Sequence, residues 1–287
     1  MRRNPCLPAL LAAVAAAALL VTPARVRAIT YGFVDTTNAY ANVGAFIVQA
    51  PSGEIFPLCS GTLIAPNVFL TASHCTAYYT NVLEPQGYTA YVSFDSSIAY
   101  GNQTSRKTKL LAVSDVVTNP NYSQRQSDSG DIGVLILESD VRGITPATLP
   151  DCGLLDRLSA ENALQGAVFT AAGYGVQNRV VGGGTPYFQD ANPVPRMYAF
   201  SSFNSLNVGY LRLSQNPATG SGGTCYGDSG GPIFLTVEGQ QVLVATTVTG
   251  DTACRSTNVV YRLDTASAQA FFEYVNATYG TQIPTSC

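Results

Sequence analysis

The chain has 287 residues, with 15 Lys or Arg, 18 Asp or Glu and one His, so its formal net charge is −3. Charged residues make up only 11% of the sequence and hydrophobic residues 46%, which excludes a charge-rich disordered chain. The length suffices for one large domain or two small ones.

The first 28 residues are predicted to be a signal peptide. Met1–Arg3 is a short basic start, Leu7–Val21 is an apolar run, and Val26–Ala28 offers small residues to a signal peptidase. The apolar run is shorter than the roughly 20 residues that a membrane span needs, and no later run is a better candidate. We therefore expect a secreted, soluble protein that has no membrane contact after signal removal and is a monomer.

Removing residues 1–28 takes away four arginines and no acids. Eleven basic and eighteen acidic residues remain, a formal charge of −7. Surfaces that bind nucleic acid or anionic membranes need clustered Lys and Arg. Neither partner is therefore predicted.

Six cysteines remain after signal removal, an even number that predicts three disulfides in an oxidising compartment. They are Cys59, Cys75, Cys152, Cys225, Cys254 and Cys287. Spacing alone leaves 15 connectivities open. Because the chain has no Cys-x-x-Cys pair and only one histidine, we predict no metal site and no cofactor.

Short apolar, β-branched runs recur along the chain, each bounded by Gly, Pro, Asn or Ser. They lie at residues 43–48, 61–64, 89–94, 132–137, 167–171, 210–213, 232–237 and 242–248. Many short strands without helical patterns between them predict an all-β sandwich or barrel.

Two segments depart from this pattern. Residues 176–195 are rich in Gly, Pro and Asn, and we expect an exposed, mobile loop there. From Asp264 onward apolar residues recur at a spacing near 3.6 and Gly280 follows as a stop, which predicts one amphipathic helix packed across the sheets. Its apolar positions are Ala268, Phe271, Phe272, Val275 and Tyr279.

The single histidine and one serine lie in motifs that suit acyl transfer. His74 lies in Leu70-Thr71-Ala72-Ser73-His74-Cys75, and Ser229 in Gly227-Asp228-Ser229-Gly230-Gly231-Pro232. A serine hydroxyl is a poor nucleophile near neutral pH and needs an adjacent base, for which an imidazole has the right pKa. The imidazole in turn needs a buried carboxylate to orient it. Asp131 opens the apolar run 131–137 and is our choice, whereas Asp128, in a Ser-rich stretch, is expected in a solvated turn.

These motifs together resemble the chymotrypsin/trypsin family of serine peptidases, in the family order His, Asp, Ser. The matching segments are residues 59–64, 70–75, 131–135, 173–175 and 227–232. The resemblance implies two six-stranded antiparallel Greek-key barrels with a C-terminal helix. The N-terminal barrel is expected over residues 29–150 with His74 and Asp131, and the C-terminal barrel over residues 151–287 with Ser229.

The resemblance implies a hydrolase that cleaves protein or peptide substrates. Ser229 attacks the peptide carbonyl, His74 moves the proton, Asp131 holds His74, and the backbone N–H groups of Gly227 and Ser229 form the oxyanion hole. Since a fold does not guarantee activity, the alternative is an inactive secreted binding protein of the same fold.

The resemblance also pairs Cys59 with Cys75 and Cys225 with Cys254. Cys152 and Cys287 remain and are paired by elimination, the alternative being that one of them is free or bonded to another chain.

Family members are normally zymogens, and their new terminal amine, here that of Ile29, pairs with the aspartate before the serine, here Asp228. Ala28 separates Arg27 from Ile29, so a cut after Arg27 does not expose Ile29. Signal cleavage after Ala28 does expose it. We therefore predict that export itself makes the active amino terminus, the alternative being a short pro-segment.

Substrate preference is also inferred from the resemblance. Gly223, six residues before the nucleophile, corresponds to the base of the primary specificity pocket, and its lack of charge excludes a preference for Arg or Lys. Val248-Thr249-Gly250 corresponds to the stretch that pairs with substrate, and Val248 lacks the hydroxyl that approaches the triad aspartate, here Asp131. Val259 stands where many members have glycine and is expected to narrow the pocket, which favours small or medium apolar side chains.

Overall fold

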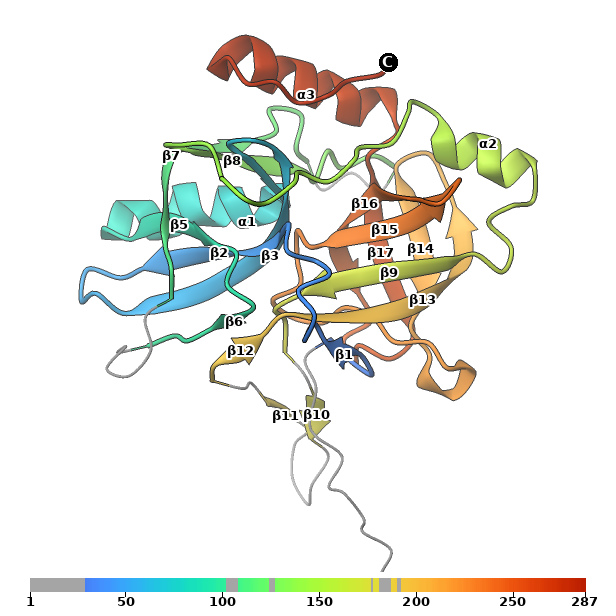
Figure 1. Ribbon diagram of the computed structural model, residues 1–287, viewed down its shortest axis with the longest axis horizontal. Coiled ribbons are helices and arrows are strands. Elements are labelled where there is room, and N and C mark those ends of the chain that lie inside the picture. Colours follow the sequence, from blue (N-terminus) through green and yellow to red (C-terminus); the bar gives the residue numbers. More distant parts are fainter. Residues whose placement is uncertain (1–28, 102–107, 124–126, 177, 181–186, 190–191) are drawn as a thin grey trace, which may run out of the picture.

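The computed structural model describes residues 29–101, 108–123, 127–176, 178–180, 187–189 and 192–287. The predicted signal peptide lies outside the described residues. Among the residues that are described, no helix is both long and apolar enough to cross a membrane. The chain forms two barrels that lie side by side, with a helix above them (Figure 1).

The N-terminal barrel is a closed ring in the order β2-β3-β4-β8-β7-β5. Its strands are β2 (Val43–Gln49), β3 (Ile55–Ala65), β4 (Val68–Thr71), β5 (Thr89–Ser93), β7 (Leu111–Thr118) and β8 (Gly133–Leu137). Between β4 and β5 lie helix α1 (Ser73–Tyr78) and two short turns, Tyr79–Leu83 and Glu84–Gln86.

Strands β2 and β8 are buried on both faces, which explains why they are continuous apolar runs rather than alternating ones. Successive side chains of a strand point to opposite faces. Phe46 and Leu135 therefore pack in a cluster inside this barrel. Their neighbours Ile47 and Ile136 pack in a second cluster that also includes residues of the other barrel and of the C-terminal helix.

The C-terminal barrel has six strands in the order β13-β14-β17-β16-β15-β9, and a β13–β9 pairing closes the ring. The strands are β9 (Val168–Gly173), β13 (Met197–Leu206), β14 (Tyr210–Ser214), β15 (Pro232–Val237), β16 (Gln240–Gly250) and β17 (Thr257–Arg262). Helix α2 (Leu154–Ala160) precedes β9, and a short turn, Pro217–Thr219, follows β14. Strand β1 (Phe33–Val34) adds to β13. The predicted two-barrel fold is confirmed.

The segment 176–195 contains short strands, so the expectation of a loop is corrected in part, whereas its exposure and mobility stay a prediction. Strands β10 (Asn178–Val180) and β11 (Tyr187–Gln189) form a hairpin, and β12 (Val194–Pro195) pairs with β6 (Ser97–Ile98). Other parts of this segment lie outside the described residues.

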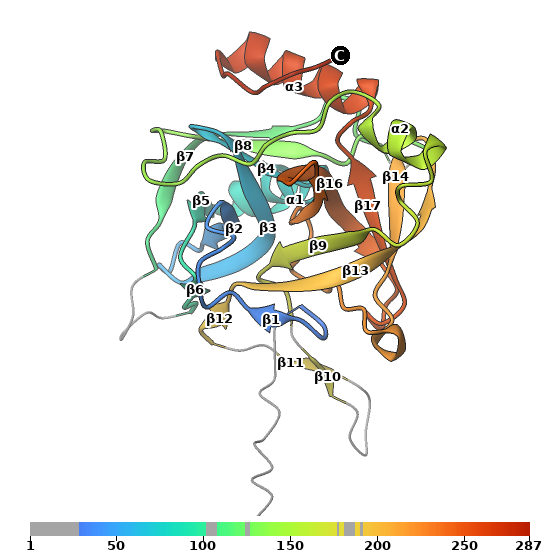
Figure 2. The same cartoon turned by 45° about the vertical axis from the view of Figure 1, so that its right-hand side comes forward.

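The predicted C-terminal helix is present as α3 (Ala266–Tyr279). It begins after Thr265, whose side chain accepts a hydrogen bond from the Ala268 N–H, and it ends at Gly280, whose φ is +67°. Its buried face shares a core cluster with residues of the N-terminal barrel, and α3 lies above β7 and β8 in both views (Figures 1 and 2).

All three expected disulfides are present: Cys59–Cys75, Cys225–Cys254 and Cys152–Cys287. The third joins the last residue of the chain to the segment just before α2. Pairing by elimination was therefore right, and neither cysteine of that pair is free.

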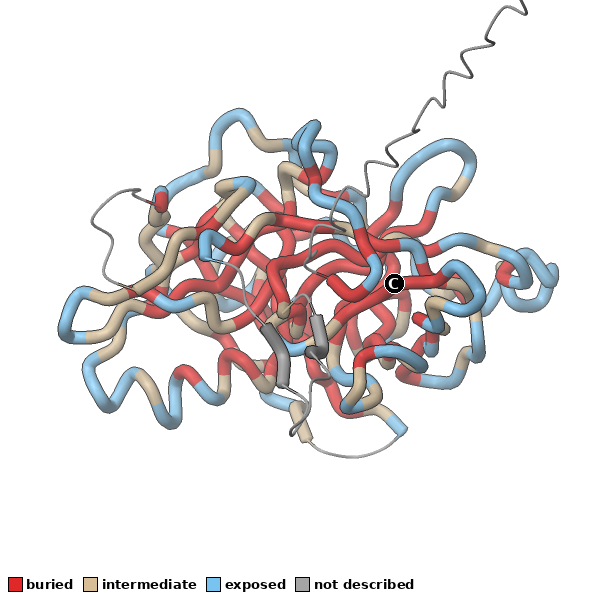
Figure 3. The backbone as a smooth tube through the Cα atoms, turned by 90° about the horizontal axis from the view of Figure 1, so that it is seen from below, coloured by how far each residue is buried: buried red, intermediate tan, exposed pale blue. Residues whose placement is uncertain are grey.

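Buried residues fill the middle of the molecule (Figure 3). Among the described residues, Arg196 has the largest fully buried side chain. Its Nε donates to Asp35 Oδ2 at 2.9 Å, and Nη1 donates to the Val43 and Phe94 carbonyls at 3.1 and 3.2 Å. Nη2 donates to Asn38 Oδ1. Since Arg196 immediately precedes β13 while Val43 and Phe94 belong to the N-terminal barrel, this guanidinium joins the two barrels.

Replacing Arg196 by methionine leaves the Asp35 carboxylate buried without its cation. We expect Arg196→Met to lower the free energy of unfolding by about 3–5 kcal/mol. Urea unfolding followed by circular dichroism measures this loss. The exposed Arg212→Met on β14 is the control and should change stability by less than about 0.5 kcal/mol. Equal losses in the two variants would show that Arg196 does not hold the barrels together.

Candidate active site

His74 and Asp131 come together because β4 and β8 are antiparallel neighbours in which Thr71 pairs with Gly133. His74 follows β4 and Asp131 precedes β8, so both leave the barrel at the same end. His74 Nδ1 lies 2.9 Å from Asp131 Oδ2, and the His74 backbone N–H donates to Asp131 Oδ1 at 2.8 Å. The Asp131 side chain is 5% exposed and that of His74 is 33% exposed. A buried carboxylate thus orients a partly accessible imidazole.

Ser73, which precedes His74, is hydrogen-bonded to Ile132, which follows Asp131, and to Asn119. Its Oγ donates to the Ile132 carbonyl at 2.7 Å and accepts from the Asn119 N–H at 3.0 Å. Sequence reasoning missed this role, because Ile132 and Asn119 lie far from Ser73 in the chain.

Asp128, the competing acid, does not contact His74 in the described structure. Its Oδ1 accepts from the Tyr261 hydroxyl at 2.6 Å and from the Gly130 N–H at 3.1 Å. Asp128 is only half-buried, but it joins the loop before β8 to β17. The expectation of a solvated turn is therefore corrected to a contact between the barrels.

Ser229 lies in the turn before β15, and that turn packs on the strand end that leads to His74. The Ser60 N–H donates to the Ser229 carbonyl at 2.9 Å. A Cβ atom at Gly230 would lie 2.7 Å from the Ala72 nitrogen, so only glycine lets the turn approach this closely. No hydrogen bond is recorded between Ser229 Oγ and His74 among the described residues, and such bonds are often long in ligand-free structures.

The backbone N–H groups of Gly227 and Ser229 have no acceptor within the part of the chain that the structure describes. Gly227 has φ +91°, a conformation that favours glycine. Ser60 Oγ donates to the Gly227 carbonyl at 3.0 Å and accepts from the Tyr174 N–H at 3.0 Å, which fixes the turn. Ser60 is a second residue whose role sequence reasoning missed.

Asp228 is completely buried beneath this turn. Its Oδ1 accepts from the Gly175 N–H at 2.8 Å, and its Oδ2 accepts from the Cys225 N–H at 2.9 Å. Burial raises the pKa of the Asp228 carboxyl to about 7, although the two N–H donors act to lower it. Cβ atoms at Gly173 or Gly175 would lie 2.3 Å from its oxygens, which explains why the Gly-Tyr-Gly motif faces it.

Ile29 is fully buried against Met197 and Ala199. The next residue, Thr30, forms a β-bridge with Gly223, and its hydroxyl donates to the Cys254 carbonyl at 2.9 Å. In this chain the Ile29 nitrogen is an amide joined to Ala28, and no ion pair to Asp228 occurs among the described residues. The pairing of an Ile29 amine with Asp228 stays a prediction for a chain cut after Ala28.

A pocket of about 220 Å³ opens beside Ser229. Its lining residues are Thr224, Cys225, Tyr226, Ser229, Thr247, Val248, Thr249, Gly250, Asp251, Thr252 and Cys254. The predicted stretch Val248–Gly250 is therefore in place. Gly223 and Val259 do not line the pocket, and a Cβ atom at Gly223 would collide with Gln215.

The prediction that Val259 narrows the pocket is corrected. Val259 pairs with Thr249, while its neighbour Asn258 pairs with Gly250. Adjacent side chains of a strand point to opposite faces, so Val259 packs in the cluster between the barrels instead.

No hydrogen bond joins Val248 to Asp131 in the described chain, and both hydrogen bonds of the Asp131 side chain are made with His74.

His74 also lies close to the Cys59–Cys75 disulfide. A disulfide sulfur has no thiolate to offer a metal.

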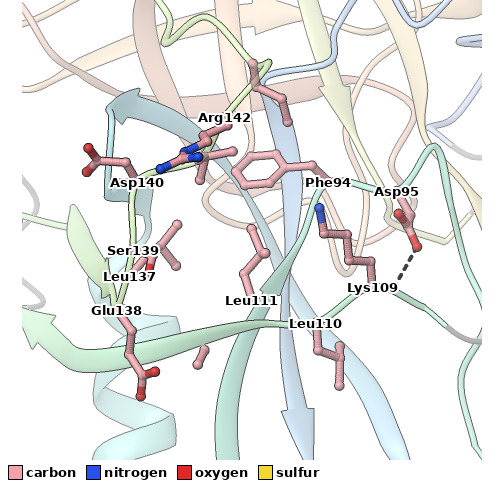
Figure 4. A pocket seen from close by; sticks show the side chains of 13 residues that line it. Phe94, Asp95, Lys109, Leu110, Leu111, Leu137, Glu138, Ser139, Asp140 and Arg142 are labelled. Carbon is pink, nitrogen blue, oxygen red and sulfur yellow. Dashed lines mark hydrogen bonds between the residues drawn. The ribbon is translucent and has the colours of Figure 1, made fainter.

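A separate cavity of about 490 Å³ lies on the N-terminal barrel, between the start of β7 and the turn after β8 (Figure 4). Phe94, Leu111 and Leu137 contribute apolar surface, and Lys109 and Arg142 lie near them (Figure 4). None of the predicted site residues lines it.

Comparison with known proteins shows the family to which the chain belongs. The sequence model of the family described as Trypsin matches residues 33–270. The chain belongs to the trypsin family.

Individual relatives are distant. The CLIP domain-containing serine protease B15 of Anopheles gambiae is 27% identical over 213 residues, which cover 71% of this chain and 57% of that protein. The chain thus spans just over half the length of this relative. The vitamin K-dependent protein C of Felis catus is 30% identical over 152 residues, 49% of this chain and 90% of the relative.

The raised pKa of Asp228 predicts a pH dependence of stability while Ile29 stays joined to Ala28. The folded state then holds a proton that the unfolded state, with a pKa of about 4, has lost. Between about pH 4 and pH 7 the free energy of unfolding therefore falls as pH rises, by up to about 1.4 kcal/mol per unit. Urea unfolding of the wild type and of Asp228→Asn from pH 4 to 8 measures this fall in the free energy of unfolding.

The difference between the two unfolding curves isolates Asp228 from all other titrating groups. Exposed Asp140→Asn controls for loss of a charge. A constant difference between the wild type and Asp228→Asn over this range would contradict the prediction.

Proposed function

We propose that the protein is a secreted serine endopeptidase. The observation that carries the proposal is the His74–Asp131 pair, held at 2.9 Å at one barrel end, against which the turn bearing Ser229 packs. The signal-like first 28 residues and the three disulfides support export. The serine protease named among the relatives supports the same class of activity.

In the proposed mechanism Ser229 Oγ attacks the carbonyl carbon of the scissile peptide while His74 Nε2 takes its proton. The tetrahedral oxyanion accepts hydrogen bonds from the free N–H groups of Gly227 and Ser229. It collapses to an acyl-enzyme as His74 gives the proton to the leaving amine. Water then attacks the ester, with His74 again as base, and Asp131 stabilises the imidazolium in both halves of the reaction.

We propose a neutral specificity pocket because Gly223 has no side chain and Gln215 fills the space where one would point. Gly223 itself does not line the pocket, and Asp251 is the acidic side chain among its lining residues. The charged carboxylate that a preference for Arg or Lys requires has no room at position 223.

A fluorophosphonate probe tests for an activated serine. We expect rapid covalent labelling of the wild-type protein and none of Ser229→Ala, because only a serine deprotonated by a neighbouring base reacts quickly. Labelled bands on a gel, with the circular dichroism of both proteins as a control for folding, give the readout. A folded wild-type protein that begins at Ile29 and stays unlabelled would instead indicate an inactive binding homologue.

Ser60→Ala removes the hydroxyl that holds the Gly227 carbonyl. Since that bond orients the proposed oxyanion hole, we expect kcat for a peptide substrate to fall about tenfold, the effect of one neutral hydrogen bond, with little change in KM. Steady-state kinetics with active-site titration measure the change. Exposed Ser52→Ala is the matched control, and an equal kcat in the two variants would contradict this role for Ser60.

A further inference from the structure

We infer that a second pocket, beside Gly227, binds an aromatic side chain of the substrate at the second residue after the scissile bond. The inference rests on the proposed function, because it concerns the leaving-group side of the peptide that Ser229 would cleave. It adds a preference on that side and leaves the pocket beside Ser229 (the first pocket) as described above.

The second pocket is apolar and has a volume of about 310 Å³. Aromatic rings line it from four positions, Phe56, Tyr100, Tyr174 and Tyr226, and its other lining residues are aliphatic, proline or glycine. The first pocket differs in polarity, because Asp251 is among its lining residues. An apolar cavity of roughly 150 Å³ is enough to hold a benzene ring. The second pocket therefore has room for one aromatic side chain.

The second pocket adjoins the proposed oxyanion hole. Gly227, which supplies one of the two N–H groups, lines the second pocket, and Ser229 lines the first. Tyr226 lines both pockets and therefore lies between them. In the proposed reaction the residue before the scissile bond enters the first pocket. The residues after the bond then extend past Tyr226 toward the second pocket.

The alternation of side chains in an extended peptide selects the second residue after the scissile bond. Successive side chains point to opposite faces, so residues two apart share a face and lie roughly 7 Å from one another. The residue before the bond and the second residue after it are two apart. Both therefore point toward the enzyme, one into each pocket, while the first residue after the bond points away.

Hydrogen bonds hold two of the aromatic walls in place without a ligand. The hydroxyl of Tyr174, which is buried, donates to the Asp95 carbonyl at 2.8 Å. The Tyr100 N–H donates to Asn192 Oδ1 at 3.3 Å, and Asn192 Nδ2 donates to the Tyr100 carbonyl at 3.2 Å. Walls that are ordered in advance lose little conformational entropy when a ligand binds.

The other two rings present exposed aromatic surface at this pocket. Phe56 is 38% exposed and Tyr226 is 53% exposed. The Val176 N–H donates to the Tyr226 carbonyl at 2.7 Å, which fixes the backbone of Tyr226. Grouped apolar surface of this kind marks a binding site, and aromatic rings pack well against another ring. A charged side chain, in contrast, would find no opposite charge among the lining residues.

Binding to Ser229→Ala tests the pocket without requiring turnover. Two fluorescein-labelled peptides differ in one residue, Phe or Ser, within an otherwise identical sequence of small residues, and fluorescence anisotropy gives each Kd. We expect the Phe peptide to bind at least about tenfold more tightly, because its ring is removed from water. Equal binding of the two peptides, or no measurable binding of either, would overturn the inference.

Variants of the aromatic walls assign the preference to the second pocket. Phe56→Ser and Tyr100→Ser, each combined with Ser229→Ala, should bring the two Kd values within about threefold of one another. Neither residue lines the first pocket. Phe200→Ser is the matched control and should keep the full preference, because Phe200 is 42% exposed and lines neither pocket.

Two wall variants are used so that misfolding of one leaves the other to decide. Circular dichroism of each variant shows whether it is folded. An unchanged preference for the Phe peptide in a folded wall variant would overturn the assignment to the second pocket.

Cleavage by the wild-type protein places the preference along the substrate. A mixture of peptides of randomised sequence is digested, and mass spectrometry of the fragments identifies the residue at each position after the cut. We expect Phe and Tyr to be enriched at the second position, and the enrichment to fall in Phe56→Ser but not in Phe200→Ser. Aromatic enrichment after the cut at another position alone would overturn the assignment to the second residue.

The two proposals fail in different ways. An unlabelled wild-type protein whose Ser229→Ala form prefers the Phe peptide, with the preference lost in Phe56→Ser, would overturn the peptidase and retain the pocket. A labelled protein whose Ser229→Ala form binds the two peptides equally would do the reverse.

Discussion

The relative position of the two barrels rests on the buried guanidinium of Arg196. The candidate site is divided between them, since His74 belongs to the N-terminal barrel and Ser229 to the C-terminal one. Arg196 Nη1 also donates to the Tyr174 hydroxyl at 3.3 Å, and the Tyr174 N–H in turn holds Ser60 Oγ. Since Ser60 Oγ donates to the Gly227 carbonyl, a continuous chain of hydrogen bonds runs from the joint between the barrels to the turn before Ser229. Such a chain transmits the geometry of the joint to the site, where a misplacement of about 1 Å is costly.

A second constraint is the carboxyl of Asp228, buried with two N–H donors and without a cation. Those donors are the N–H groups of Gly175 and Cys225. Burial disfavours the charged form of this carboxyl. A neighbouring positive charge would stabilise the ionised carboxylate, and no ion pair to Asp228 occurs in the described part of the chain. Ile29 is fully buried and precedes Thr30, which bridges Gly223, but its nitrogen is an amide while Ala28 is attached. The predicted release of that amine by cleavage after Ala28 stays the candidate source of such a charge.

The sequence predicted the features that depend on local pattern. The strands, the terminal helix and its stop at Gly280 follow from apolar periodicity and from glycine. The choice of Asp131 over Asp128 followed from the apolar run after it, because a strand that is buried on both faces carries its first residues into the core. The disulfides followed from the family resemblance and the even cysteine count. The roles of Ser60, Ser73 and Gln215 could not be predicted in this way, because each acts on residues far away in the chain, although Ser60 and Ser73 lie within the matched segments.

The pocket shows why a pocket-lining residue cannot be identified by its spacing along a strand alone. Strand β16 has an irregularity between Thr247 and Thr249, so the register against β17 shifts by one residue there. A one-residue shift exchanges the two faces of a strand, and Val259 packs against the cluster between the barrels rather than along the pocket. Position 223 likewise has no room for any side chain, charged or neutral, because Gln215 occupies the volume that it would need. The glycine and the glutamine are therefore coupled, since a change of either residue alters the space that the other requires.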